Sequence, residues 1–193
     1  MQQFNWNQAM SNSAVPERIH GVRLVLRLIT PEDADYVYSL RTDARYNTHL
    51  SPVTGSVADQ RAWIEQYKWR EAAGQEYYYI IERRDNARAC GAVRLYDIQD
   101  TCFTWGSWIL DENKPAKAAL ESAVLVYQVG FNIFGLNKSI FDVRKDNQRT
   151  FNFHRRFGAV EISRDLHEIY FEYTRNQFLA DQPSHHAKII EAL

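Results

Sequence analysis

The stretch from residue 103 to residue 159 constrains the fold of this chain more than any other part. It reads as a strand, "FTWGSWIL", a polar turn, "DENKPAK", a long apolar helix, "AALESAVLVYQVGFNIFG", a second strand, "KSIFDVR", and a last helix, "DNQRTFNFHRRFGA". A strand that runs directly into a helix N-terminus creates an anion site, because the first backbone N–H groups of the helix have no internal partner and the helix dipole adds positive potential. We expect the second strand and helix to return beside the first pair.

The rest of the chain supplies elements that complete a sheet around this unit. "GVRLVLRLIT" alternates apolar and polar residues as a strand does. Helices are predicted from Thr30 to about Thr42 and from Ser56 to Gly74, because each begins with a hydroxyl cap followed by acids. "EYYYIIERR", "ACGAVRLYDI" and the strand at Phe103 predict an antiparallel meander, and "AVEIS" with "HEIYFEYTR" a final strand pair. The predicted fold is α/β, with a mixed, mostly antiparallel central sheet and helices on both faces.

Length and composition favour one soluble domain. The chain has 193 residues, 45% of them hydrophobic and 24% charged, and a net charge of -1, which excludes nucleic acid as the main partner. We expect an N-terminal arm over residues 1–20, the domain over 21–175 and a C-terminal helical extension over 176–193. The polar N-terminus does not read as a signal peptide, and no apolar run approaches the ~20 residues that span a bilayer. These features predict a cytoplasmic protein without a membrane partner; a homodimer is left open.

Cysteine and histidine usage predicts no metal site. The two cysteines, Cys90 and Cys102, do not make a disulfide framework, and no Cys/His cluster has metal-ligand spacing. We therefore expect free thiols in a reducing compartment.

Two lysines stand at the start of the long helix. Lys114 and Lys117, together with free N–H groups, suit a phosphate or pyrophosphate ligand. The alternative is that both lysines are merely solvated, with Asp111 and Glu112 offsetting their unfavourable position near a helix start. The residues alone leave the two interpretations open.

The last helix carries a polar stripe. Asn147, Thr150 and His154 are spaced i, i+3, i+7 and share one face. A histidine on such a stripe can exchange a proton near neutral pH, although a structural histidine holding a backbone carbonyl is the alternative. We expect a second face to point to solvent with Arg149, Asn152 and Arg156.

The order of elements, together with residues 103–159, resembles the GNAT superfamily of acyl-CoA N-acyltransferases. The similarity is greatest to the branches that acetylate nucleotide-linked amino sugars or ribosomal-protein N-termini. It covers roughly Arg23 to Tyr173 and is most specific in "NQRTFNFHRRFGA". The resemblance implies acetyl-CoA as co-substrate and a small-molecule amine as acceptor.

The resemblance also implies roles for individual residues. "SWIL" would pair with the pantetheine arm, and an N–H around Ser107 or Trp108 would polarise the thioester carbonyl. Asn147 would contact the pantetheine arm, and His154 stands where many members have a tyrosine that protonates the CoA thiolate. "KPAKAA" stands at the pyrophosphate loop. The implied cofactor-binding set is Trp108, Ile109, Leu110, Lys114, Ala116, Lys117, Ala118, Ala119, Asn147 and Thr150.

The sequence departs from the family pattern at two places. Pro115, Lys117 and Ala119 replace the loop glycines, which normally let the backbone approach pyrophosphate closely. Thr104 stands where several members carry a catalytic glutamate, and neither Glu82 nor Asp97, on neighbouring strands, can be assigned to the pocket from the sequence.

The acceptor side is predicted from a loop. Tyr46 and His49 could stack on a base or sugar ring, and Thr104 would lie beside them. The strand tyrosines, Tyr77 to Tyr79, are interpreted as core residues.

The sequence thus predicts transfer of an acetyl group from acetyl-CoA to the primary amine of a small substrate, with a nucleotide-linked amino sugar favoured, by direct attack. Water or His154 would relay the proton from the amine, and His154 would be the thiol's acid. The alternatives are a ribosomal-protein-like N-terminal acetyltransferase and a GNAT-fold binding module that has lost catalysis. A different acyl donor is a further alternative, because Trp105 and Trp108 flank the thioester position.

Overall fold

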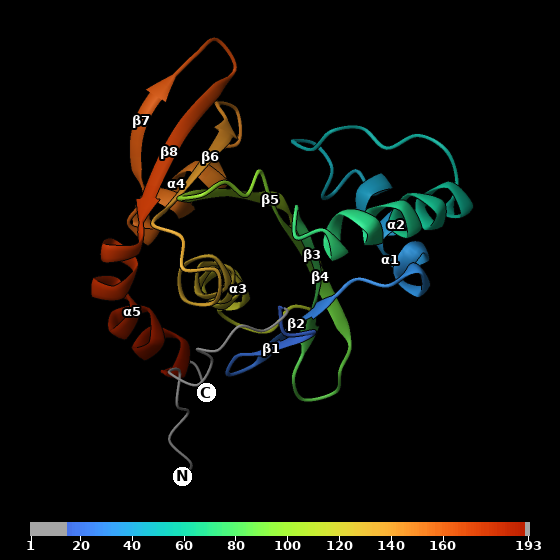
Figure 1. Cartoon of the computed structure of the whole chain (residues 1–193), viewed down its shortest axis with the longest axis horizontal. Helices are drawn as coiled ribbons and strands as arrows, with labels where there is room; N and C mark the ends of the chain where they lie inside the picture. The colour runs from blue at the N-terminus through green and yellow to red at the C-terminus, as the bar shows by residue number, and fades with distance from the viewer. Residues whose placement is uncertain (1–14, 192–193) are drawn as a thin grey trace.

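The strands of this chain form one eight-stranded sheet in the computed structural model, which describes residues 15–191 (Figure 1). The strands are β1 (Arg18–His20), β2 (Leu24–Leu28), β3 (Tyr77–Arg83), β4 (Ala89–Tyr96), β5 (Cys102–Leu110), β6 (Lys138–Arg144), β7 (Val160–Arg164) and β8 (Glu168–Thr174). Their order is β1-β2-β3-β4-β5-β6-β8-β7, and only β5 and β6 pair in parallel within this sheet. The predicted α/β class with a mixed, mostly antiparallel sheet is confirmed.

Helices cover both faces of the sheet. They are α1 (Ala34–Thr42), α2 (Val57–Ala72), α3 (Ala118–Gln128), α4 (Gln148–Phe157) and α5 (Arg175–Ile190). Figure 1 shows α1 and α2 on one side, and α3 with α5 on the other. Ser56 and Asp59 form the capping box that begins α2, and Gly74 adopts a left-handed conformation after its end. Each face of the sheet therefore has its own apolar core.

The chain ends differ in part from the expectation. Residues 18–20, predicted to belong to an N-terminal arm, form β1, which pairs with β2 and buries Ile19. Alternation of apolar and polar residues cannot be recognised over three residues, so only the pairing with β2 identifies β1 as a strand. Residues 1–14 of the predicted arm and the final residues 192–193 lie outside the described part.

The described residues contain two free cysteines, Cys90 and Cys102. None of the helices between residues 15 and 191 combines the length and apolarity needed to cross a bilayer. Within the same range, no three His, Cys, Asp or Glu side chains are grouped to hold a metal ion.

The sheet opens at its centre. The parallel pairing of β5 with β6 is limited to Cys102 with Lys138 and Phe103 with Ser139, near the beginning of both strands. Beyond these pairs the two strands separate, while β6 continues to pair with β8 over its whole length. The sheet is therefore not continuous between the carboxyl ends of β5 and β6.

Candidate functional site

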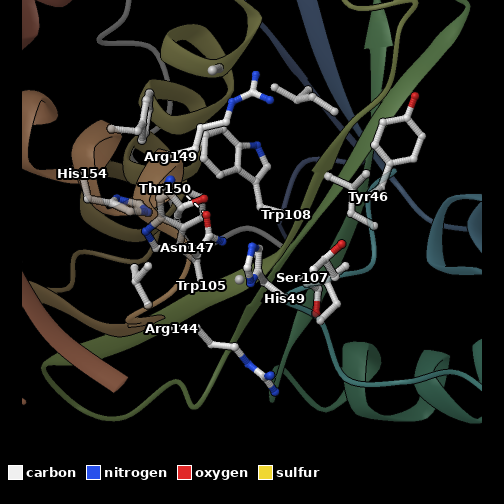
Figure 2. Close-up of a pocket in the computed structure, with 18 of the residues that line it drawn as sticks. Tyr46, His49, Trp105, Ser107, Trp108, Arg144, Asn147, Arg149, Thr150 and His154 are labelled. Atoms are coloured by element: carbon white, nitrogen blue, oxygen red, sulfur yellow. Dashed lines mark hydrogen bonds between the residues drawn. The ribbon is translucent and has the colours of Figure 1, made fainter. Parts of the chain in front are cut away.

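A cavity of about 960 Å³ lies where β5 and β6 separate (Figure 2). Its walls come from the end of β5, the turn that begins α3, the end of β6, the first two turns of α4 and the loop after α1. Segments that are more than 100 residues apart in the sequence therefore meet around one space. The cavity borders both the α3 side and the α1–α2 side of the sheet.

β5 carries a bulge at the cavity wall. Gly106 pairs with Arg94 and Ile109 pairs with Ala92, so Ser107 and Trp108 together oppose a single residue of β4. Ser107 has a φ of 48°, a left-handed conformation that is costly for a residue with a side chain. Bulges of this kind leave backbone groups outside the ladder and redirect them. The stretch Ser107–Leu110, predicted to face the acyl donor, lines the cavity.

The turn before α3 presents Lys117. Lys117 is the N-cap of α3 with a φ of 62°, where glycine is the usual residue. Its side chain is exposed, and within residues 15–191 it forms no ion pair. Lys114 is different, because its Nζ donates to the carbonyl oxygen of Asp111 at 3.0 Å. Of the two predicted cations, Lys117 is therefore available to a ligand, whereas Lys114 is bound to a carbonyl oxygen of its own turn.

The two acids of this turn do not offset Lys117. Asp111 Oδ2 accepts a hydrogen bond from the Tyr36 hydroxyl at 2.8 Å, and Asp111 Oδ1 accepts from the amide of Asn113 at 2.7 Å. Glu112 lies 3.3 Å from Arg45. These contacts do not support the interpretation in which Asp111 and Glu112 neutralise the lysines. Ala116, Ala118 and Ala119 line the cavity beside Lys117.

The polar stripe of α4 faces the cavity as its spacing predicts. Asn147 caps the helix, and its Oδ1 accepts from the amide of Thr150 at 3.1 Å. This bond uses the amide oxygen and leaves the NH₂ group of Asn147 as a donor. Arg149, expected to point to solvent, also borders the cavity. Asn147, Arg149 and Thr150, at the beginning of α4, all lie at the cavity (Figure 2).

His154 is enclosed by aromatic rings. The centroids of Phe141, Phe153 and Trp105 lie 4.4, 5.3 and 5.4 Å from its own, and only 4% of the residue is exposed. Its Nδ1 is buried without a hydrogen-bond partner, so it does not hold a backbone carbonyl through that atom. Burial lowers the pKa of His154 to about 3. The imidazole is therefore neutral at physiological pH.

The loop after α1 forms the opposite wall. Tyr46 and His49, expected from the sequence to contact the acceptor, both line the cavity. The Tyr46 hydroxyl donates to Glu112, and His49 Nδ1 lies 3.4 Å from Asp146 Oδ1. Thr104, which was predicted to contact the acceptor, does not line the cavity. It lies on β5 and pairs with Tyr96 of β4.

Some lining residues were missed by sequence reasoning. They lie on three strands and are Tyr96, Asp142, Arg144 and Glu168. The signal was present for β6, because Asp142 and Arg144 alternate with buried Phe141 and Val143. What alternation could not tell is that this exposed polar face also borders a cavity. Glu82, by contrast, is bound by Arg18 and Arg27 and does not line the cavity.

Comparisons with known proteins agree with this geometry. A family model described as the acetyltransferase (GNAT) domain matches residues 23–160. Among solved structures, "Apo FdhC, a nucleotide-linked sugar GNAT" is 39% identical, with a TM-score of 0.82 over 89% of this chain and 97% of that chain. A putative ribosomal-protein-serine acetyltransferase from Vibrio cholerae is 18% identical, with a TM-score of 0.67 over 81% of this chain and 97% of the other.

A third solved structure shares the same fold. The ribosomal-protein-S5-alanine acetyltransferase from Vibrio fischeri is 12% identical, with a TM-score of 0.68 over 83% of this chain and 98% of the other. The search of curated protein sequences found no match.

Proposed function

The chain belongs to the GNAT acetyltransferase family and is an acetyl-CoA-dependent N-acetyltransferase, and from this premise we propose that its acceptor is the primary amine of a nucleotide-linked amino sugar. The observation that carries the proposal is the 39% identity to a nucleotide-linked sugar GNAT over 89% of this chain. The cavity supports it, because about 960 Å³ with polar and aromatic walls suits two extended ligands better than one small amine.

The α3 side of the cavity suits the pyrophosphate of the acyl donor. The first backbone amides of α3 have no partner within the helix, and Lys117 adds a cation that forms no ion pair with an acid of residues 15–191. Arg149 at the start of α4 would supply a second cation to the same anion. The NH₂ group of Asn147 and the backbone of β5 from Trp108 to Leu110 would contact the pantetheine arm. The glycine-free loop is thus compatible with the donor through a side-chain cation.

The reacting groups would meet at the bulge of β5. A backbone N–H of Ser107 or Trp108, outside the sheet ladder, would donate to the thioester oxygen as negative charge develops there. His154, neutral at rest, would take a proton from the attacking nitrogen and deliver it to the departing sulfur. The imidazole then begins and ends the reaction neutral, which fits its lowered pKa.

The α1 side would receive the acceptor. Tyr46 presents an aromatic ring to the cavity and would contact the base or the sugar ring. His49 and Arg144 would lie near the acceptor's diphosphate, since both border the cavity on this side.

The charge of Lys117 is tested by titrating acetyl-CoA calorimetrically. We expect Lys117→Glu to raise the Kd about 30-fold or more, because it removes a charge-assisted contact and adds repulsion. Lys117→Gly is the matched control: it suits the left-handed backbone and removes the cationic side chain without adding a negative charge, so we expect about tenfold weaker binding. Equal affinities in all three proteins would remove Lys117 from the donor site, and a folded natural chain that binds no acetyl-CoA would refute the donor assignment.

The acceptor class is tested by a screen with acetyl-CoA as donor. The panel contains UDP-, GDP- and dTDP-linked amino sugars, the same amino sugars without nucleotide, and peptides with ribosomal-protein N-termini. We expect at least one nucleotide-linked sugar to exceed its free sugar about 100-fold in kcat/KM, since the nucleotide supplies binding energy. Turnover of peptides alone, or equal turnover of free and linked sugars, would contradict the proposal.

A further inference from the structure

The outer face of β6 and β8 brings two carboxylates into the cavity wall. Arg144 pairs with Glu168 and Asp142 pairs with Tyr170 across these strands, so all four side chains lie on one face. The opposite face, with Phe141 and its neighbours, is buried beneath α4. Asp142 and Glu168 both line the cavity, and they are the two carboxylates among its lining residues in the described chain.

Asp142 lies close to the end of β4 across the opening in the sheet. Gly106 on β5 leaves room there, since a Cβ on it would lie 3.0 Å from the Tyr96 hydroxyl oxygen. Tyr96 and Asp142 both line the cavity, and burial and then the charge of Asp142 raise the pKa of Tyr96. Gly106 directly precedes the bulge at Ser107. Asp142 and the part of β5 where the thioester is expected therefore line the same cavity.

The Glu168 carboxylate is partly buried, and its ion pair with Arg144 is long. Its side chain is 23% exposed, its Oε2 is buried without a hydrogen-bond partner, and its Oε1 lies 3.9 Å from Arg144 Nε. The charged groups that face it are Asp142 and Arg144 on β6 and Asp165 and His167 in the turn before β8. Burial first, and the charge of Asp142 second, raise the pKa of Glu168. A carboxylate in such a setting binds a proton more readily than one in water.

A second group able to carry a proton lines the same cavity. His154 is only 4% exposed, and its Nδ1, in the wall of this cavity, is buried without a hydrogen-bond partner. His154 lies on the side of α4, whereas Asp142 and Glu168 lie on the outer face of the sheet. Ser107 and Trp108, at the bulge, line the same cavity as both sets of groups. Proton-handling groups thus flank the opening in the sheet from its two sides.

We propose that Glu168, with Asp142 beside it, binds the ammonium form of the acceptor and takes its proton before attack. The proposal rests on the proposed function and assigns the base that Thr104 does not supply. The N–H bond of the ammonium breaks and an O–H bond forms on Glu168, which later releases the proton to solvent. The free amine forms the C–N bond as the C–S bond breaks, and the second proton passes from nitrogen to sulfur through His154. One proton leaves in each cycle.

The test is the pH dependence of kcat/KM, measured with the nucleotide-linked amino sugar that gives the highest kcat/KM in the screen. We expect Glu168→Gln to lower kcat/KM on the order of 10²-fold at pH 7. The loss should shrink as the pH approaches the pKa of the amine, because the free amine then forms without a base. Asp142→Asn should move the acidic limb of the profile to lower pH, because it removes the negative charge that raises the pKa of Glu168.

Glu172→Gln is the matched control. Glu172 lies on the same strand, is paired with Lys138 at 3.3 Å and does not line the cavity, so its kcat/KM should stay within twofold of the natural chain. The Kd for acetyl-CoA should be unchanged in all three variants. An active natural chain whose Glu168→Gln variant stays within twofold at every pH, or an acidic limb unmoved by Asp142→Asn, would overturn the inference alone. A natural chain that acetylates no nucleotide-linked sugar would instead refute the proposed function, and this inference with it.

Discussion

We expect His154→Phe to lower kcat between 10²- and 10⁴-fold and, at the same time, to make the fold more resistant to acid. The loss of activity follows from removing the group that would move a proton between nitrogen and sulfur. The gain in resistance to acid follows because burial lowers the pKa of His154 to about 3, well below the ordinary value of 6.5. Phenylalanine is close to histidine in size and suits the surrounding rings, so stability at pH 7 should change little.

The sign of the pH effect can be worked out from this shift. Well above pH 6.5 the imidazole is neutral in both the folded and the unfolded chain, so it contributes no pH dependence there. Below pH 6.5 the unfolded chain binds a proton that the folded chain refuses until about pH 3, and the free energy of unfolding falls. The loss between pH 6.5 and pH 5 is about 2 kcal/mol. His154→Phe should remove this part of the slope.

Urea unfolding at pH 7 and pH 5 measures the slope, and His185→Phe is the matched control. His185 is also buried with a lowered pKa, but it stacks on Phe157 from α5 and does not line the cavity. Its replacement should also reduce the slope while leaving kcat within twofold. Retained activity in His154→Phe would exclude the proton relay, and an unchanged slope would show that burial does not hold His154 neutral.

We expect Glu121→Ala to lower the free energy of unfolding by about 3–5 kcal/mol. Glu121 lies on α3 and is 2% exposed, and its Oε1 accepts hydrogen bonds from the amides of Arg23 and Leu24 at 2.8 and 3.0 Å. Removing the carboxylate leaves two amides without an acceptor in a closely packed place. The same contact holds α3 against β2, so the helix whose first turn borders the cavity would also lose its support.

Urea unfolding at one pH measures this loss, with Glu121→Gln and Glu65→Ala beside it. Glutamine keeps an acceptor oxygen for the two amides, so we expect a loss of only about 1–2 kcal/mol. Glu65 is exposed on α2, and its replacement should change stability by less than about 0.5 kcal/mol. If Glu121→Ala cost no more than Glu65→Ala, the buried carboxylate would not be what joins α3 to β2.

Much of the fold follows from signals that lie within a few residues of one another. The capping box of Ser56 and Asp59 and the Asn147 cap both occur where the sequence indicates a helix start. The α/β class, the family and the acetyltransferase activity could be predicted because the unit over residues 103–159 combines these local signals in one order. The stripe of Asn147, Thr150 and His154 faces one cavity because helical spacing alone puts the three on one side.

The sequence by itself therefore determined the elements, their order and the side chains that share a face, since caps and periodicity are properties of neighbouring residues. Only the tertiary structure decided the rest. The bulge at Ser107 depends on the register between β4 and β5, and β1 forms only because β2 lies beside it. The neutral state of His154 depends on rings contributed by β5, β6 and α4. Asp142 and Glu168 face a cavity because β5 and β6 separate, and strand pairing across the sheet, not the local sequence, sets where that happens.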